Sequence, residues 1–481
     1  MQIAKEVETL KGTETPKETL YLYKDRVKEH LLIYKARTDH QFLVLTQRAE
    51  KIFLACDGKQ TTQDICSILQ AQGYNTKEIV QTILALSRER VLKISDEFDQ
   101  QFLPPLRPPA KENAFGIWLH ITNACNLRCS YCYIDKDRGS MTISIAERAV
   151  LNAIEQCKKY QIRNLSIKFA GGEPLIAWKN ILRIIDFARK ACNGSNIKPK
   201  FNILSNGTLM KKDIATYLAI NRIPIAISLD GIREVNDRQR FYLDGRGSFS
   251  EVERCIQILR DSGWKPFVLI TITDRNVEGL PDLTSYLLRQ GLSFRYSFVR
   301  DCDQMPAQHL FHASTKYAEV LHRCFDEIEA WMLTKSWDFN VRLCDVKLDH
   351  PISRACGIGK SSVAVDHNGS IALCQMVFDT PIGNVNNNGL IETIQTQQII
   401  PSLQEKSVDD YLDCNQCVWK DVCAGGCPIF TYKQFGRFDV SSPYCHVFQT
   451  LIPRVVRLTG IKLVREYEKM KGGDEHARSA N

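Results

Sequence analysis

Between residues 116 and 299 the sequence alternates short apolar runs with longer amphipathic segments. The apolar runs are predicted to be strands, and the segments between them helices. This alternation favours an α/β fold with a parallel sheet, because parallel strands need a crossover connection that is usually a helix. Six such units suit a partial (βα)6 TIM-type barrel, with active-site residues at the carboxyl ends of the strands. The predicted strands are residues 116–121, 164–169, 200–204, 223–229, 267–272 and 294–299.

A proline-rich stretch marks the start of this barrel. Residues 103–110 hold four prolines in eight positions, a composition that resists helix and strand and favours an extended connector. After a helical segment at 314–334 the alternation stops, and cysteine and turn residues become frequent. We therefore predict a first domain, a linker, the barrel, a cysteine-rich module, and a final helix with a polar tail, at residues 1–103, 104–113, 114–340, 341–450 and 451–481.

The composition excludes several classes of protein. The chain has 18 cysteines in 481 residues but no signal-peptide pattern at its start, so clustered thiols indicate metal rather than a secreted disulfide scaffold. No stretch reaches the roughly 18 apolar residues of a membrane span. The net charge of +8 is a modest excess without a concentrated nucleic-acid patch. We predict a cytoplasmic protein with no membrane partner and no nucleic-acid partner.

Three cysteines follow the first predicted barrel strand with the spacing CxxxCxxC, at Cys125, Cys129 and Cys132. Three thiolates cannot complete the ligation of a four-iron cluster, so one iron is left open to bind a substrate or cofactor. The alternative is a structural zinc site. Such a site usually has a fourth protein ligand, and none is obvious close by in the sequence.

The segment Cys125-Asn-Leu-Arg-Cys129-Ser-Tyr-Cys132 resembles the signature of the radical S-adenosylmethionine superfamily, and Tyr131 before the last cysteine fits it. The resemblance implies a 4Fe-4S cluster whose open iron is chelated by the amino and carboxylate groups of S-adenosylmethionine. It also implies a reductive cleavage to methionine and a 5′-deoxyadenosyl radical, which takes a hydrogen atom from the substrate. The electron would come from a donor such as flavodoxin or ferredoxin. The protein's task would be to position and shield these groups.

Glycine and polar residues follow the next three predicted strands. The turn Ala170-Gly-Gly-Glu-Pro174 comes directly after the second strand, and its glycines let the backbone approach a ligand closely. By the same resemblance, this turn would hold the methionine amino group. The polar residues after the third and fourth strands would meet the ribose and the carboxylate of S-adenosylmethionine. Arg238 or Arg240 would be the partner of that carboxylate. The predicted cofactor-binding residues are Gly171, Gly172, Glu173, Ser205, Asn206, Ser228, Asp230, Arg238 and Arg240.

The cysteine-rich module carries a second pattern, which resembles the SPASM extension of peptide-modifying members of the superfamily. The pair Asn368-Gly369 is a strong hairpin signal and would fold the flanking cysteine segments back toward one another. The pattern runs Cys356-x12-Gly369-x4-Cys374, then Cys414-x2-Cys417-x5-Cys423-x3-Cys427, then Cys445.

The connectivity of that family implies two auxiliary 4Fe-4S clusters, and hence three clusters in all. Cys356, Cys374 and Cys427 would bind one, completed either by Cys344, whose spacing is wider than in relatives, or by an open iron. Cys414, Cys417, Cys423 and Cys445 would bind the other. Two zinc sites are the alternative. We interpret the remaining cysteines as ordinary buried residues without a metal role: Cys56, Cys66, Cys157, Cys192, Cys255, Cys302 and Cys324.

The first hundred residues resemble the PqqD-like peptide-recognition domain, a small winged-helix-like fold, in the order of their apolar runs and helix-like segments. Winged helices more often bind DNA, but the near-neutral charge of this segment offers little to a duplex. The resemblance implies recognition of the leader of a ribosomal precursor peptide. We predict that the leader adds as a strand near Gln41 to Leu45, against the helix carrying Ile79, Ile83 and Leu86.

Together these features predict a radical S-adenosylmethionine and SPASM enzyme, an oxidoreductase, that modifies a ribosomally made peptide. An intramolecular crosslink is favoured, either a cyclophane-type carbon-carbon bond or a thioether. The alternatives are a peptide epimerase or splicease, a sulfatase-type protein maturase, and a non-catalytic iron-sulfur or zinc scaffold. The leader-like domain argues against the protein maturase.

Overall fold

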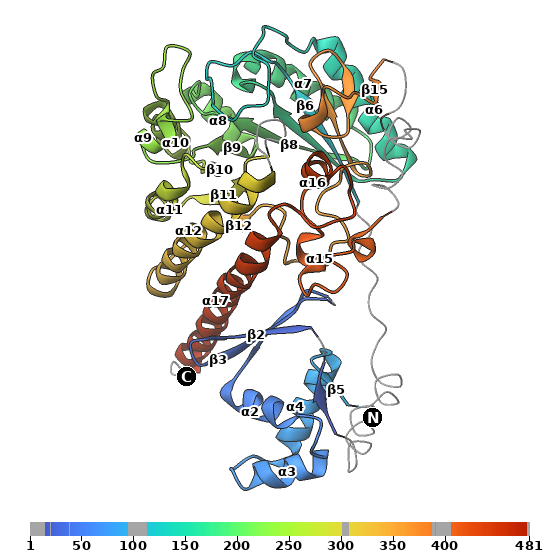
Figure 1. Ribbon diagram of the computed structural model, residues 1–481, viewed down its shortest axis with the longest axis vertical. Coiled ribbons are helices and arrows are strands. Elements are labelled where there is room, and N and C mark those ends of the chain that lie inside the picture. The colour runs from blue at the N-terminus through green and yellow to red at the C-terminus, as the bar shows by residue number, and fades with distance from the viewer. Residues whose placement is uncertain are drawn as a thin grey trace.

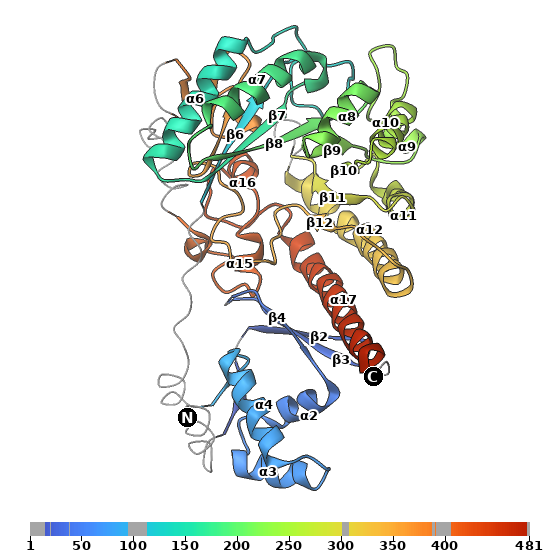
Figure 2. The same ribbon diagram turned by 180° about the vertical axis from the view of Figure 1, so that it is seen from behind.

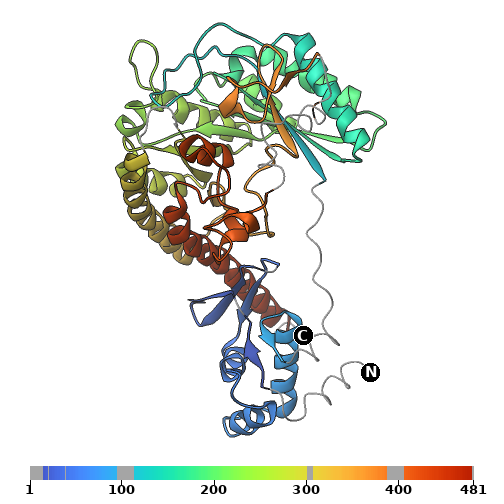
Figure 3. The same cartoon turned by 45° about the vertical axis from the view of Figure 1, so that its right-hand side comes forward.

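The computed structural model describes residues 15–94 except 20 and 38, residues 113–300, 307–386 and 390, and residues 406–478. A large sheet with its helices forms one end of the molecule, and a cysteine-rich segment packs beneath it (Figure 1). A smaller N-terminal domain lies along the long C-terminal helix (Figure 3). The proline-rich stretch at 103–110 and the end of the predicted first domain lie outside the described residues.

Six parallel strands form the barrel in the order in which they occur along the chain. All six predicted strands are confirmed, with small shifts at their ends, and so is the α/β fold class. Their bounds are β6 Ala114–His120, β7 Asn164–Ala170, β8 Lys198–Ser205, β9 Ile225–Ser228, β10 Phe267–Ile272 and β11 Ser293–Phe298.

Helices between the strands cover the outer face of this sheet (Figure 2). Alternate strand residues such as Ile117, Ile167 and Ile203 are fully buried in the core, as the two-residue period of a strand requires. The intervening residues project to the opposite face, which is the interior of the barrel. The helical elements are α6 Ile143–Lys159, η1 Pro174–Ala177, α7 Trp178–Ala191, α8 Lys212–Ile220, α9 Glu234–Asp237, α10 Phe249–Asp261, η2 Val277–Gly279, α11 Leu280–Arg289 and α12 Ala307–Thr334.

Strands from the cysteine-rich segment extend the sheet at both edges. β12 (Val341–Leu343) pairs in parallel with β11, and β13 (Ser362–Val365) pairs in parallel with β6. β13 also forms an antiparallel hairpin with β14 (Ser370–Ala372), and β14 pairs with β15 (Gly383–Asn384). The predicted Asn368-Gly369 turn closes the hairpin, with Gly369 at a φ of +88° that favours glycine. This hairpin places Cys374 beside the first barrel strand.

The rest of the cysteine-rich segment is short helices and turns, followed by one long helix. The elements are η3 Gln375–Val377, η4 Val408–Asp410, α15 Lys420–Cys423, α16 Pro428–Phe435 and α17 Cys445–Arg478. The predicted C-terminal helix is therefore present and begins at Cys445. Of the helices in the described part of the chain, none combines the length and the apolar character that a bilayer span requires.

The N-terminal domain follows the predicted order of strands and helices. Three antiparallel strands form a sheet in the order β2-β3-β4, so β4 is an edge strand, and β1 pairs with β5. The elements are β1 Lys17–Glu18, β2 Leu22–Val27, β3 His30–Lys35, β4 Phe42–Leu45, α2 Gln47–Ala55, α3 Thr62–Gln70, α4 Thr76–Arg88 and β5 Leu92–Lys93.

Strand β3 is shared by two hydrophobic cores. Ile33 packs with the helices of the N-terminal domain, whereas Leu32 and Tyr34 belong to the main core of the molecule. Gly460 of α17 permits this contact, because a Cβ atom there would lie 2.3 Å from Leu32 Cδ2. The ring of Tyr34 also stacks on Trp419 of the cysteine-rich segment, with centroids 6.4 Å apart. The N-terminal domain is therefore part of the main core, and its removal would expose an apolar face of α17.

This shared strand predicts that Leu32→Ala and Ile33→Ala destabilise the protein to a similar extent. Both side chains are fully buried, and truncation of a buried leucine or isoleucine to alanine costs about 2–5 kcal/mol. Urea unfolding measures the free energy of unfolding, and Leu54→Ala, at an exposed position of α2, is the control. A cost for Leu32→Ala as small as that of the control would mean that the domain does not pack on α17 in solution.

Candidate metal centres and cofactor site

The loop that follows β6 carries the three cysteines of the CxxxCxxC motif, Cys125, Cys129 and Cys132. A second segment of the chain holds this loop by backbone hydrogen bonds. The Arg128 amide donates to the Phe241 carbonyl at 2.7 Å, and the Ser130 amide donates to the Gln239 carbonyl at 2.9 Å. These bonds fix the backbone between Cys125 and Cys132 against residues 239–241.

The spacing of the thiols bears on the kind of metal. Tetrahedral zinc thiolates have Zn–S distances near 2.3 Å, which places their sulfur atoms about 3.8 Å apart. Within the described residues, Glu29, His30 and Glu468 form the single group of three potential ligands whose atoms lie within 4.8 Å of one another, and Glu468 already pairs with Lys28. In the part of the chain that the structure describes, no three cysteine sulfur atoms are that close together.

The predicted Gly171-Gly172 turn packs directly against the cluster loop. The Gly172 amide donates to the Thr122 carbonyl at 2.6 Å. A Cβ atom on Gly171 would lie 2.4 Å from the Thr122 carbonyl oxygen, and one on Gly172 would lie 2.3 Å from the Ala124 carbonyl oxygen. Gly171 also has a φ of +147°. The cluster loop itself therefore requires glycine at both positions, in addition to any ligand.

Glu173 has no exposed surface, and its carboxylate is fully engaged within the protein. Its oxygens accept hydrogen bonds from the Leu175 amide at 3.0 Å, the Ser205 hydroxyl at 2.8 Å and the Asn206 amide at 2.7 Å. Burial raises the pKa of this carboxyl, and the three hydrogen bonds oppose that rise. Glu173 thus joins the end of β7 to the end of β8.

Asn206 connects β8 to the cluster loop. Its Nδ2 donates to Asn126 Oδ1 at 3.0 Å and lies 3.8 Å from Cys125 Sγ, while its Oδ1 accepts from the Thr208 hydroxyl. Asn126 Nδ2 in turn donates to the Thr208 hydroxyl at 2.8 Å. Asn126 and Thr208 were not among the predicted site residues. Asn126 follows Cys125 in the sequence, and Thr208 lies two residues after Asn206. This closeness to predicted site residues is the sequence feature that could have identified them.

Tyr131 is held by a buried ion pair that the sequence did not reveal. Its hydroxyl donates to Asp230 Oδ2 at 2.6 Å and contacts Arg240 Nη1, and Asp230 pairs with Arg240 at 3.3 Å. Asp230 also accepts from the Thr271 amide at 2.7 Å. The ring that precedes Cys132 is therefore anchored to the ends of β9 and β10.

The two arginines predicted as carboxylate partners differ in position. Arg238 is exposed, whereas Arg240 is buried beside the cluster loop. Arg240 Nε is buried and has no hydrogen-bond partner among the described residues. A buried donor without a partner is costly, so this atom fits an anionic group bound next to the cysteines. Ser228 lies at the end of β9 and is half-buried.

Four cysteines of the C-terminal segment line one cavity, together with Gly425 and Phe448. Burial, together with the charges of the neighbouring Cys445 and Cys417 thiols, raises the pKa of the Cys414 thiol to about 12. Thiols with such pKa values are protonated at neutral pH, so a metal ion must displace their protons on binding. The four cysteines are those predicted to act together: Cys414, Cys417, Cys423 and Cys445.

The other predicted set, Cys356, Cys374 and Cys427, forms a separate group. Cys356 is exposed as a residue, but loss of hydration at its thiol and the charges of Cys427 and Cys374 together raise the pKa of this thiol to about 12. The three thiols therefore lie within electrostatic reach of one another. Cys344 is buried and lines a different cavity, of about 290 Å³, which also contains Cys132.

The remaining cysteines agree with their interpretation as ordinary residues. Cys56, Cys157, Cys192, Cys255 and Cys324 are buried in hydrophobic cores, and Cys66 is half-buried. Cys302 lies outside the described residues.

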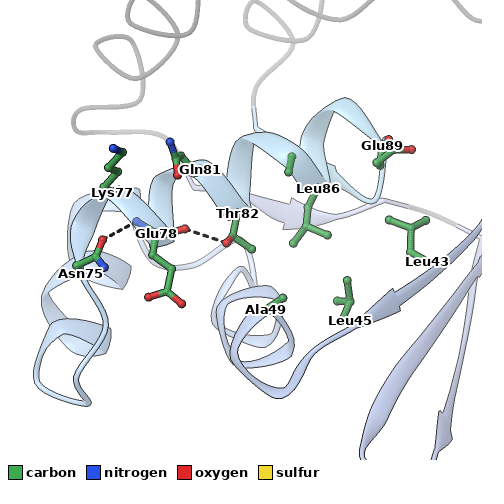
Figure 4. A pocket seen from close by; sticks show the side chains of 11 residues that line it. Leu43, Leu45, Ala49, Asn75, Lys77, Glu78, Gln81, Thr82, Leu86 and Glu89 are labelled. Atoms are coloured by element: carbon green, nitrogen blue, oxygen red, sulfur yellow. Dashed lines mark hydrogen bonds between the residues drawn. The ribbon is translucent and has the colours of Figure 1, made fainter. Parts of the chain in front are cut away.

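A groove of about 540 Å³ runs along the N-terminal domain between the edge strand β4 and helix α4 (Figure 4). Leu43 and Leu45 from β4 and Leu86 from α4 form its apolar part, and Glu78 and Glu89 lie on its rim. The prediction that the leader binds against Ile79, Ile83 and Leu86 of α4 is partly wrong. Leu86 lines the groove, but two further residues point into the core of the domain and have no exposed surface: Ile79 and Ile83.

Two family models match the chain. The radical SAM superfamily matches residues 119–283, and the SPASM iron-sulfur cluster-binding domain matches residues 356–418. The first range covers the cluster loop, the glycine turn and the ends of β8 and β9, and the second contains Cys356, Cys374, Cys414 and Cys417.

Similar proteins include both protein maturases and peptide maturases. The cysteine-type anaerobic sulfatase-maturating enzyme of Clostridium novyi is 24% identical over 72% of this chain and 96% of its own length. The antilisterial bacteriocin subtilosin biosynthesis protein AlbA of Bacillus subtilis is 24% identical over 78% of this chain and 82% of its own length.

Two solved structures share the fold. Native anSMEcpe with bound AdoMet gives a TM-score of 0.59 at 19% identity, over 72% of this chain and 99% of that one. Streptococcus suis SuiB bound to precursor peptide SuiA gives a TM-score of 0.51 at 15% identity, over 89% of this chain and 98% of that one. The chain therefore combines a radical S-adenosylmethionine domain with a SPASM iron-sulfur cluster-binding domain on an α/β fold.

Proposed function

We propose that this protein cleaves S-adenosylmethionine reductively and uses the resulting radical to modify a ribosomally made precursor peptide. The observation that carries the proposal is the cluster loop: three cysteines with the CxxxCxxC spacing, beside the buried Nε of Arg240, which has no partner among the described residues. The bound cluster and S-adenosylmethionine would supply a 5′-deoxyadenosyl radical. The modification of a peptide is supported by similarity to AlbA, a protein of subtilosin biosynthesis.

The chain's own residues would position and shield these groups. Cys125, Cys129 and Cys132 would hold the cluster, and Arg240 Nε would donate to the carboxylate of S-adenosylmethionine. The backbone of Gly171 and Gly172 would face its amino group. Glu173, Ser205 and Asn206 would act by fixing the strand ends around the site, since their hydrogen bonds are made within the protein.

The C-terminal cysteines would hold two auxiliary 4Fe-4S clusters. The grouping of Cys414, Cys417, Cys423 and Cys445 around one cavity supports one of them. The separate group of three supports the other, completed by Cys344 or left with an open iron. Such clusters could accept the electron released when a substrate radical closes a new bond, with flavodoxin or ferredoxin as the donor for the first step.

The groove of the N-terminal domain would bind the leader of the precursor. β4 has a partner strand on one side only among the described residues, so its other edge is available for a peptide strand. Added strands make main-chain hydrogen bonds, and side-chain pockets select the sequence. The apolar floor at Leu43, Leu45 and Leu86 would take alternate apolar side chains of the leader.

The favoured transformation is an intramolecular crosslink, a cyclophane-type carbon-carbon bond or a thioether, in a cytoplasmic enzyme. Maturation of a sulfatase is a second candidate, because the Clostridium novyi relative is a sulfatase-maturating enzyme. The groove beside β4 favours the peptide, since the edge strand and apolar floor would bind a leader at a distance from the chemistry.

Co-expression without oxygen tests the function. Short peptides encoded beside the gene should change in mass when they are co-expressed with the wild-type protein. Gly172→Ala should lower both the amount of modified peptide and the yield of 5′-deoxyadenosine by about 100-fold, because the added methyl group displaces the cluster loop. Gly116→Ala, whose added Cβ would make ordinary contacts, is the matched control. Wild-type protein that cleaves S-adenosylmethionine but modifies none of these peptides would argue against a peptide substrate.

Metal analysis tests the number of clusters. Anaerobically reconstituted protein should bind about twelve irons, from three clusters of four irons each. Cys414→Ala should lose about four of them while S-adenosylmethionine cleavage continues, because the radical would be made at the other cluster. Iron near four per chain, or stoichiometric zinc, would refute the two auxiliary clusters.

Leader recognition can be tested by filling the groove. Ala85 is an exposed residue of α4 that lines it, and Ala85→Arg should weaken binding of the leader at least about ten-fold by occupying the path of the peptide. Cleavage of S-adenosylmethionine should be unchanged. Ser67→Arg, on the exposed surface of α3 outside the groove, is the control. Equal leader affinity in the two variants would contradict the assignment of this groove.

A further inference from the structure

The interior face of the barrel carries a row of polar side chains that the functions described above do not use. Trp118, Lys168 and Asn202 are register partners on β6, β7 and β8, so their side chains lie side by side on one face. Their neighbours along each strand are buried in the core on the opposite face. The Nζ of Lys168 lies 5.3 Å from the centre of the Trp118 ring. This row forms part of the barrel floor.

Several polar atoms of this floor have no hydrogen-bond partner among the described residues. Trp118 Nε1, a donor, is buried and unpartnered, and so is Asn202 Oδ1. Lys168 makes no ion pair with any described carboxylate. Partial burial lowers the pKa of Lys168, and the charge of Arg295 on β11 lowers it further. A cation that loses part of its hydration without gaining a carboxylate partner is costly unless an anion joins it.

Arg295 lies on the wall of the cavity of about 290 Å³ described above. Its Nε donates to the Ser297 hydroxyl at 3.1 Å. The carboxylate in the lining, Asp345, pairs with Arg300 at 2.6 Å. The cavity also contains Cys132 of the cluster loop. Arg295 therefore has no ion-pair partner among the described residues, and it lies in the same cavity as a cysteine of the loop where the radical is predicted to form.

We propose that this cavity selects a carboxylate of the substrate peptide, which binds Arg295. This inference rests on the proposed function and names the chemistry of the reacting segment. The carboxylate belongs either to an aspartate or glutamate near the modified residue or to the C-terminus of the peptide. A guanidinium fork suits either source, because its donors match the two oxygens of a carboxylate.

The thiolates of an auxiliary cluster are the competing partner of these cations. The charge of Cys374 opposes the lowering of the Lys168 pKa, and Cys344 acts in the same way on Arg295. A role toward the cluster would change its reduction potential and would affect acidic and neutral substrates alike. A role toward the substrate would affect acidic substrates alone. The two roles therefore give different results in one experiment.

The test uses the precursor peptide found by co-expression, the full reconstituted protein, and a double-mutant cycle. Each acidic residue near the modified position is changed to its amide, and in a separate arm the C-terminus is amidated. Arg295→Gln should raise the KM of the unchanged precursor at least about ten-fold, the effect of losing one charge-assisted hydrogen bond. One of the neutral precursors should show the same rise with wild-type protein and no further rise with Arg295→Gln. That precursor identifies which carboxylate binds.

Exchanging the charges of Arg295 and of the selected precursor residue distinguishes loss of their contact from a loss of protein stability. Arg295→Glu should prefer a precursor in which the selected acidic residue is replaced by lysine. Lys200→Gln, an exposed cation of β8 outside the cavity, should leave the KM unchanged. The proposal would be overturned if the precursor had no carboxylate near the modified position. It would also be overturned if Lys168→Met shifted the reduction potential of the cluster and lowered the turnover of acidic and neutral precursors equally. Absence of peptide modification by the wild-type protein would instead refute the function on which it rests.

Discussion

The buried carboxylate of Glu173 is the interaction on which the geometry of the cluster loop depends. It accepts hydrogen bonds from the ends of η1 and β8, and its own amide donates to Ala124 in the loop that carries the first cysteine. A carboxylate without solvent contact is tolerated because three donors satisfy it. Since the donors come from two segments, η1 and the end of β8, a shift of either segment would leave a buried acceptor unpaired. The loop is thereby held by the sheet rather than by its own sequence.

A second constraint joins the N-terminal sheet to the cysteine-rich segment. β3 places alternate residues in two cores, and Trp419, which lies between two predicted cluster ligands in the sequence, contacts Tyr23 and Tyr34 of that sheet. The proposed leader groove on β4 is therefore attached to the auxiliary module by packed aromatic rings. Such packing would fix the position of a bound leader relative to the barrel and would raise the effective concentration of the peptide at the cavity.

Charge is distributed unevenly inside the barrel. Near the cluster loop, Asp230 and Arg240 neutralise each other and anchor Tyr131. Across the interior, Lys168 and Arg295 have no carboxylate within ion-pair distance among the described residues. A bound anion would stabilise the second arrangement. Beside the cysteines, Arg240 Nε is left without a partner among the described residues, so each of the two places has a donor or cation available for an anionic group.

The sequence alone determined the strand and helix order, the position of the cysteine loop after the first barrel strand, and the glycine turn after the second. These features are local, because strand periodicity, turn glycines and cysteine spacing are each set within about ten residues. Only the tertiary structure decided which distant residues meet. It separated Arg238 from Arg240, placed Ile79 and Ile83 in the core of the N-terminal domain, and joined Tyr131 to Asp230. It also put Arg295 in one cavity with Cys132. Such pairings depend on sheet curvature and on which helix face is buried, and these follow from packing between segments that are far apart in the chain.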